Sequence, residues 1–334
     1  MRTIIAFIIG IVLFGACSEH SEKPKITIQN TDILIANQGN FGWGEGTLSL
    51  YNPSTKSVQN EVFKAVNGKS LGNVFQSIST HKNSYYFVMN NSGKIIITDS
   101  MYKQTGEING LTSPRYMYPL NENKAYVTDL YANGINVIDL AKNEITHSIS
   151  CRGWSEKGVF IDGLFWYTGS STNQLYAIDI SNDKLVDSIQ VGSSPESLIV
   201  DNQSCLWVLC RGDEELKELP CLVRIDKPIT GELDLKIELK ENPTQLRYDT
   251  RLDQLYFING DIWSMSSKSA IPKPFIAHQN RTFFGINIDP ISSDVYVSDV
   301  RDFVSRSEVF VYDYQGLLKD TFFVGIIAGD FFFP

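Results

Sequence analysis

The sequence predicts an all-β protein: a seven-bladed β-propeller that follows a lipoprotein signal peptide. Two observations support this fold. An apolar segment that ends in Asp or Asn, with Ser in one copy, recurs at intervals of 40 or 47 residues, and a second strand-like segment precedes every copy. The chain has 334 residues, of which 43% are hydrophobic and 20% charged, so it can bury a substantial core.

Residues 1–16 are predicted to be the signal peptide. Arg2 precedes an apolar stretch that ends in Gly15 and Ala16, directly before Cys17. This stretch is too short to cross a bilayer, which takes roughly 20 residues, but it suits a secretory signal. Small residues before a cysteine are typical of bacterial lipoprotein cleavage sites, so we expect Cys17 to carry a lipid anchor. Ordinary secretion is the alternative, and residues 17–25 form a polar tether in either case.

The propeller is predicted to occupy residues 26–334. The recurring segments that end in Asp, Asn or Ser are expected to be the third strands of the blades, at residues 48–52, 95–99, 136–139, 176–179, 223–226, 263–266 and 310–313. The second strands are expected at residues 33–36, 86–89, 125–128, 165–168, 206–209, 255–258 and 295–298. Short β-branched and aromatic runs, about four per repeat of 40–50 residues, are the signature of propeller blades.

The recurring Asp or Asn is predicted to accept backbone amides in the turn after the third strand, because short polar side chains stabilise turns in this way. The closure of the ring stays open. Residues 26–28 would either begin the first blade or complete the last one, and the apolar tail 325–334 must be buried somewhere.

Charge and composition exclude several functions. Acidic residues outnumber basic ones by 38 to 29, which disfavours a nucleic-acid partner. The four histidines have no spacing typical of a metal site or of a catalytic triad, and no nucleotide-binding motif is present. The sequence therefore predicts neither an enzyme nor a resident cofactor.

Two cysteines are predicted to face each other in one hairpin. Cys210 ends a second strand and Cys221 begins the following third strand. Because an exported protein meets oxidising conditions, a disulfide between them is possible, with two unpaired thiols as the alternative.

One face of the disc is the predicted binding site. In a propeller, the start of each first strand and the loop after each second strand lie on the same face, so side chains there are expected to approach the axis. Amides, both charges and aromatic rings suit a large ligand of mixed polarity, although a solvated face would contain the same residue types. The predicted ligand-binding residues are Asn37, Gln38, Asn40, Phe41, Gln76, Asn90, Arg115, Tyr116, Asp129, Tyr131, Trp154, Glu196, Arg211, Asn259, Phe284 and Asp299.

Four segments add a resemblance to a known family: ILIANQGNFG at 33–42, GTLSLYNP at 46–53, NNSGKI at 90–95 and GIIAGDF at 325–331. They resemble the YncE-like β-propeller lipoproteins of Bacteroidetes, and among these the surface cobalamin-binding propellers of the BtuG type. The resemblance implies a non-enzymatic outer-membrane lipoprotein at the cell surface. It would bind vitamin B12 and related corrinoids as transported ligands and deliver them to a TonB-dependent outer-membrane transporter.

Two other functions stay open. One is a surface propeller that binds a glycan or a protein for adhesion or as a scaffold. The other is a metal-dependent, lactonase-like hydrolase, for which Glu196, Asn90 and Asp129 are conceivable metal ligands.

Overall fold

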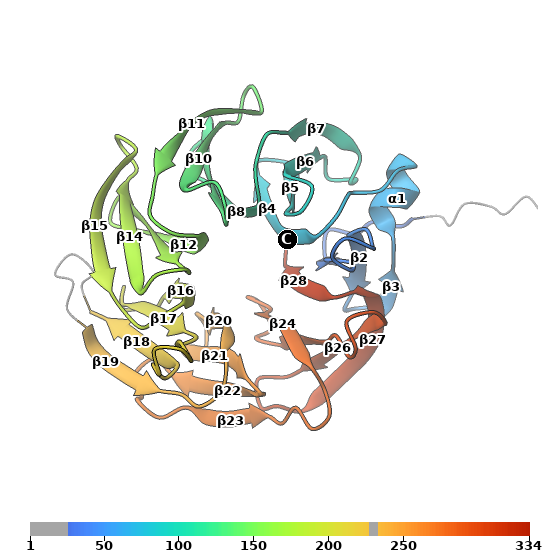
Figure 1. Cartoon of the computed structure of the whole chain (residues 1–334). Helices are drawn as coiled ribbons and strands as arrows, with labels where there is room; N and C mark the ends of the chain where they lie inside the picture. The colour runs from blue at the N-terminus through green and yellow to red at the C-terminus, as the bar shows by residue number, and fades with distance from the viewer. Residues whose placement is uncertain (1–25, 227–232) are drawn as a thin grey trace, which may run out of the picture.

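The computed structural model describes residues 26–226 and 233–334, and it confirms the all-β, seven-bladed β-propeller (Figure 1). Seven four-stranded antiparallel sheets surround a central axis, and the C-terminus lies close to that axis. The predicted signal peptide, the tether and the lipidation site Cys17 lie outside the described residues. Within residues 26–226 and 233–334, no helix is long and apolar enough to cross a membrane.

Each blade runs from an innermost strand at the axis to an outermost strand at the rim. Blade one contains, in that order, β28 (Ala328–Phe332), β1 (Ile33–Asn37), β2 (Thr47–Asn52) and β3 (Ser57–Gln59). Blades two and three contain β4 (Phe75–His81), β5 (Ser84–Met89), β6 (Lys94–Thr98) and β7 (Gln104–Ile108), then β8 (Pro114–Pro119), β9 (Lys124–Asp129), β10 (Gly134–Asp139) and β11 (Glu144–Ser150). Blade four contains β12 (Ser155–Ile161), β13 (Leu164–Gly169), β14 (Gln174–Asp179) and β15 (Lys184–Gln190).

The remaining blades follow the same order. Blade five contains β16 (Pro195–Val200), β17 (Leu206–Cys210), β18 (Cys221–Ile225) and β19 (Leu233–Glu238). Blade six contains β20 (Thr244–Asp249), β21 (Gln254–Asn259), β22 (Asp261–Ser266) and β23 (Lys273–Ile276). Blade seven contains β24 (Phe283–Ile288), β25 (Val295–Asp299), β26 (Arg306–Tyr312) and β27 (Leu318–Ile326).

The two repeated segments occupy the predicted second and third strands of every blade. The polar residue after the third strand stabilises its turn as expected. Asn52 Oδ1 accepts the amides of Ser54 and Thr55, and Asp139 Oδ1 accepts those of Ala141 and Lys142. These residues therefore shape the face opposite to the predicted site.

Blade one closes the ring with both ends of the described chain. The C-terminal strand β28 is its innermost strand and pairs antiparallel with β1, with Phe332 opposite Leu34 and Phe331 opposite Ile35. This arrangement buries the apolar tail and settles how the ring closes. Ile26 and Ile28 form no strand, but they pack against the hydrophobic cluster between blades one and two.

The core lies between neighbouring blades. In one cluster, Val88 and Ile95 of blade two pack against Met117 and Val127 of blade three. Every residue of β17 is buried, as a strand covered on both faces requires. The six-residue helix α1 (Val62–Asn67), which the sequence patterns did not predict, joins blades one and two and buries Val62.

The innermost strands carry an irregularity that matters for the site. The pairing register shifts near the start of β4, β8, β12, β16, β20 and β24. A bulge of this kind changes the direction of the side chains that follow it. Neighbouring residues at these positions consequently face different parts of the axial region.

Candidate functional site

A cleft of about 740 Å³ lies on the predicted face, over blades three to six. Trp154, Glu196 and Arg211, three of the predicted binding residues, line it. The charged and amide-bearing lining residues that the prediction missed are Glu156, Asp213, Glu214, Lys217, Glu218, Lys240, Glu241 and Asn242. Most of these belong to the hairpin loop 211–220 or to the connection between blades five and six, where the sequence shows no strand pattern.

Hydrogen bonds hold the loop that forms one wall of the cleft. Asp213 and Glu218 exchange two backbone hydrogen bonds of 2.9 Å across the tip of the loop. Ser193 Oγ donates a hydrogen bond to the Glu218 carboxylate, and Arg211 Nε donates one of 2.7 Å to Asn242 Oδ1. A loop held in this way loses little conformational entropy when it binds a ligand.

Aromatic side chains stand at the edge of the cleft. Trp154 is 45% exposed, and its indole meets the ring of Tyr131, which is 56% exposed, edge to face at a centroid distance of 5.4 Å. Exposed rings of this size offer flat apolar contact area together with a polar end. The structure thus brings Tyr131, Trp154, Glu196 and Arg211 into one region.

A hydrogen-bonded network surrounds the axis below this region. Arg115 donates from Nη1 to Gln76 Oε1 and from Nε to Glu156 Oε2, the latter at 2.8 Å. Gln76 Nε2 also donates to the Tyr116 hydroxyl at 3.3 Å. Three predicted residues, Gln76, Arg115 and Tyr116, are therefore partners of one another.

Five predicted residues at the ends of second strands form hydrogen bonds to nearby loops or strands: Asn37, Asn90, Asp129, Asn259 and Asp299. All of them are buried. The carboxylate of Asp129 accepts the backbone amides of Thr112, Ser113, Tyr131 and Ala132, and Asn90 Nδ2 donates to Ser113 Oγ and Pro114 O. The structure gives these side chains a role in holding the loops and does not gather them around a ligand space.

The other predicted residues lie away from the cleft. Gln38, Asn40 and Phe41 belong to the glycine-rich loop between β1 and β2, where Phe41 is 71% exposed. Phe284 meets Phe303 edge to face at 6.1 Å in blade seven. None of these four residues lines the 740 Å³ cleft.

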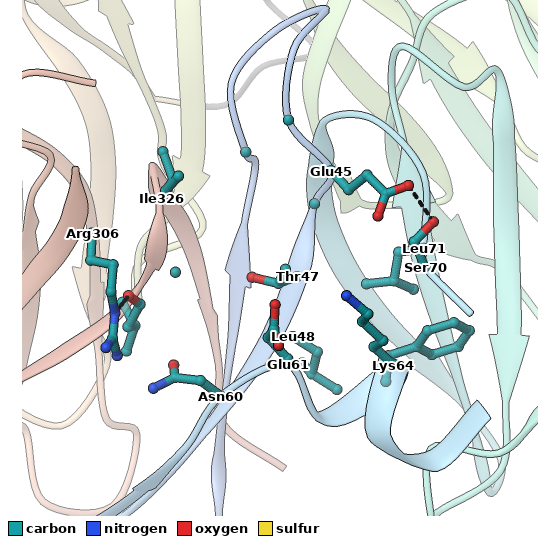
Figure 2. Close-up of a pocket in the computed structure, with 16 residues that line it drawn as sticks. Glu45, Thr47, Leu48, Asn60, Glu61, Lys64, Ser70, Leu71, Arg306 and Ile326 are labelled. Atoms are coloured by element: carbon teal, nitrogen blue, oxygen red, sulfur yellow. Dashed lines mark hydrogen bonds between the residues drawn. The ribbon is translucent and has the colours of Figure 1, made fainter. Parts of the chain in front are cut away.

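A separate pocket of about 520 Å³ lies between blade seven, blade one and α1 (Figure 2). Arg306 and Ile326 stand on one side, while Ser70 donates a 2.6 Å hydrogen bond to Glu45 on the other. The Arg306 guanidinium is already bonded to the carbonyls of Val324 and Phe323. No predicted binding residue lines this pocket.

The predicted cysteine pair is adjacent, with unbonded sulfur atoms. Cys210 and Cys221 are directly opposite in the β17–β18 ladder, and both are free, buried thiols. A hydrogen bond between the thiols raises the pKa of Cys210 and lowers the pKa of Cys221. The disulfide stays a prediction.

The residues proposed for a catalytic metal are not arranged as ligands. Asp129 and Asn90 are held by the loop contacts described above, and Glu196 Oε2 accepts the Gln245 amide at 3.0 Å. Across residues 26–226 and 233–334, no group of three or more His, Cys, Asp and Glu side chains is placed to hold a metal ion.

Solved structures show where this fold occurs. A quinoprotein alcohol dehydrogenase-like protein from Bacteroides thetaiotaomicron VPI-5482 matches with a TM-score of 0.72 and 14% identity, over 91% of this chain and 78% of the other. A functionally unknown protein from Desulfotomaculum acetoxidans DSM 771 matches with a TM-score of 0.66 and 12% identity, over 91% and 98%. Dihydro-heme d1 dehydrogenase NirN in complex with DHE matches with a TM-score of 0.63 and 7% identity, over 95% and 78%. At these identities the likeness concerns the fold.

Sequence comparison identifies the family. No curated protein matches the chain. Residues 31–234, more than half of the chain and covering most of blades one to five, match the family described as "Domain of unknown function (DUF5074)". The chain therefore belongs to the DUF5074 family, and it is a seven-bladed member of the β-propeller fold.

Proposed function

We propose that this protein captures a corrinoid in the 740 Å³ cleft and delivers it to a TonB-dependent outer-membrane transporter. It would do so as a lipoprotein anchored to the outer membrane through Cys17, at the cell surface. The role is binding, without catalysis. The sequence resemblance to YncE-like and BtuG-type propellers suggests the ligand, and the cleft provides a place for it.

The observation that carries the proposal is the pair of exposed aromatic rings, Trp154 and Tyr131, beside a cleft with an ordered wall. A volume of about 740 Å³ falls in the range of small-molecule sites. A corrinoid is a broad ring with an apolar face and many amide groups at its rim. The aromatic rings would contact the face, and groups such as Arg211 and Asn242 would bond to the amides.

One solved structure with the same fold contains a ligand related to a corrinoid. Dihydro-heme d1 dehydrogenase, which shares only the propeller fold with this chain, was solved in complex with DHE. Its named substrate, a dihydro-heme, is a tetrapyrrole-derived macrocycle, as a corrinoid is.

The test is a titration of the purified protein with cyanocobalamin, followed by absorbance and by calorimetry. We expect saturable binding and a Kd at least tenfold higher for Trp154→Ala, which corresponds to about 1.4 kcal/mol. Trp43→Ala is the matched control, because Trp43 is 96% exposed and does not line the cleft. No binding at micromolar protein, or equal effects of the two substitutions, would refute the proposed site.

Anchoring and delivery need separate measurements. Radiolabelled palmitate should be incorporated into the wild-type protein in its host and not into Cys17→Ala. A TonB-dependent receptor should co-purify with the wild-type protein from detergent-solubilised outer membranes. Label in the Cys17 variant would count against the anchor, and the absence of any receptor would count against delivery.

A glycan-binding or protein-binding surface is the second candidate. It is favoured by Phe41 and Trp43, which stand 71% and 96% exposed on one loop, because exposed aromatic clusters often mark interaction sites. A glycan array probed with the wild-type protein and with Trp43→Ala distinguishes the two candidates. A glycan signal lost in Trp43→Ala, together with no cyanocobalamin binding, would support this alternative.

A further inference from the structure

The axial region holds a second cavity, of about 670 Å³. It is formed mainly by the later residues of the innermost strands, toward the turns that join first to second strands. This is the face opposite to the corrinoid cleft. Its polar lining includes Tyr116, Lys157, Arg247 and Asp330, and none of these residues lines the cleft.

Lys157 and Arg247 bring two positive charges to this cavity without ion-pair partners. Among the described residues, no carboxylate oxygen lies within 4.0 Å of either cationic group. Arg247 donates to Leu246 O at 3.0 Å and to Gln245 Oε1 at 2.6 Å, and both of these acceptors are neutral. Lys157 Nζ lies 3.7 Å from the ring centre of Tyr116, a cation–π contact.

The acidic groups nearby are already satisfied. Asp330 Oδ2 accepts the Ile78 amide at 3.2 Å. Burial raises the pKa of Asp330, which disfavours its charge, although the charges of Lys157 and Arg247 act in the opposite direction. Glu156 is paired with Arg115, and Glu196 accepts a backbone amide from β20. The two cations therefore outnumber the one carboxylate that lines the cavity.

The surroundings of Lys157 disfavour its positive charge, so a bound anion would stabilise the protonated lysine. Burial first, and then the charge of Arg247, lower the pKa of Lys157 to about 7, although Asp330, Glu196 and Glu156 act in the opposite direction. A lysine partly neutral at physiological pH gains a proton when an anion binds beside it. The two cations would then share that anion instead of repelling each other.

Apart from Ser77, Thr250 and Asn287, the remaining lining residues of the cavity are mostly apolar or aromatic. Val159 and Phe160 come from β12, Leu198 and Ile199 from β16, and Phe332 from β28. A bare inorganic anion would gain nothing from such walls, whereas an apolar group would be removed from water.

We propose that this cavity is a binding site for an organic carboxylate with an apolar body. The carboxylate lies between Lys157 and Arg247, and the body packs against Phe160 and the apolar residues of β16. This site is independent of the corrinoid cleft, and each can exist without the other.

The test is calorimetry on the purified protein with three probes: 3-phenylpropionate, its neutral analogue 3-phenylpropionamide, and inorganic phosphate. We expect the carboxylate to bind at least tenfold more tightly than either of the others. Titrations at pH 7.5 in two buffers of different ionisation enthalpy should show net uptake of protons, because a lysine whose pKa is lowered to about 7 is partly deprotonated at that pH.

Variants at Lys157 test whether this side chain takes up the proton when the carboxylate binds. Lys157→Met should abolish proton uptake and raise the Kd for 3-phenylpropionate at least tenfold. Lys157→Arg should bind 3-phenylpropionate without proton uptake. Lys184→Met, an exposed lysine in an outer strand of the same blade, should behave as wild type. If Lys157→Met does not fold, the proposal is still tested by proton uptake in the wild type and by the Lys157→Arg result.

Three results would overturn the proposal. They are no carboxylate binding at millimolar concentration, equal affinity for carboxylate and amide, and binding without proton uptake in the wild type. Tighter binding of phosphate than of the carboxylate would also overturn it. None of these results bears on cyanocobalamin titration, so a failure here is distinguishable from a failure of the proposed function.

Discussion

Asp129 tests whether the buried polar residues at the ends of second strands are structural. Its position in the sequence predicts a ligand-binding residue, whereas the structure shows a side chain that is 1% exposed and bonded to four backbone amides. Two of these amides precede β8 and two follow β9, so one carboxylate fastens two loops of blade three. Asp129→Ala removes all of these contacts.

The size of the effect follows from the exposure of each donor. Hydrogen bonds to charged groups contribute about 1.5–3 kcal/mol each, and an unsatisfied buried donor costs about 1–3 kcal/mol. The Ser113 amide belongs to a buried residue, whereas Thr112 and Tyr131 are exposed and can bond to water instead. We therefore expect Asp129→Ala to lower the free energy of unfolding by about 3–5 kcal/mol.

The assay is guanidinium denaturation followed by tryptophan fluorescence and by circular dichroism. Asp139→Ala is the matched control, because Asp139 lies in the same blade and accepts two amides in an exposed turn on the opposite face. Asp139→Ala should lower the free energy of unfolding by clearly less than Asp129→Ala. If Asp129→Ala is as stable as Asp139→Ala and yet loses cyanocobalamin binding, the structural interpretation is refuted and Asp129 contacts ligand.

Three further predictions concern the rest of the disc. Phe331→Ala should cost about 3–5 kcal/mol in denaturation, since this buried ring closes blade one; a loss below about 1 kcal/mol would contradict that role. Although burial raises the pKa of Asp183, hydrogen bonds from Lys124 and a neighbouring tyrosine outweigh it and hold the pKa below the usual value. The ionised Asp183 carboxylate therefore stabilises the folded state above about pH 4, and this stabilisation is lost as the pH falls further. Asp183→Asn should make the free energy of unfolding depend less on pH in the acid range. An unchanged pH dependence would contradict this expectation. Peptide mapping without reduction, after mild oxidation, should find Cys210 linked to Cys221, and two free thiols would exclude the disulfide.

The fold was predictable because its signals are local. Each second strand is an apolar or aromatic run, and each third strand is followed by a polar turn residue at a nearly constant spacing. The closure was not predictable in the same way, since β28 and β1 stand at opposite ends of the described chain. A pairing across that separation leaves no periodic trace, and only the apolar character of the tail indicated that it is buried.

The sequence indicates on which face of the disc the candidate cleft lies and some of the residues that line it. Topology places the starts of first strands and the ends of second strands together, and Trp154, Glu196 and Arg211 line one cleft in the structure. Residue type alone does not tell a carboxylate that binds a ligand from one that accepts its own loop amides, as Asp129 does.

The shift in register near the start of β12 explains a further difference. Glu156 and Lys157 are neighbours in β12, yet they line different openings. In the structure, Glu156 lines the cleft on the predicted face, and Lys157 lines the cavity on the opposite side. Successive residues of a strand point in opposite directions, so a bulge that the sequence does not reveal decides which of the two reaches which opening.

The two openings differ in charge, and this difference constrains what each can hold. The cleft is lined by six acidic residues against three basic ones, whereas the axial cavity is lined by two cations and one buried carboxylate. An anionic small molecule is therefore disfavoured at the cleft and favoured in the cavity, and a neutral, amide-rich ring suits the cleft better. The network of Gln76, Arg115 and Glu156 connects the two regions, because Glu156 lines the cleft while the bonded Tyr116 lines the cavity.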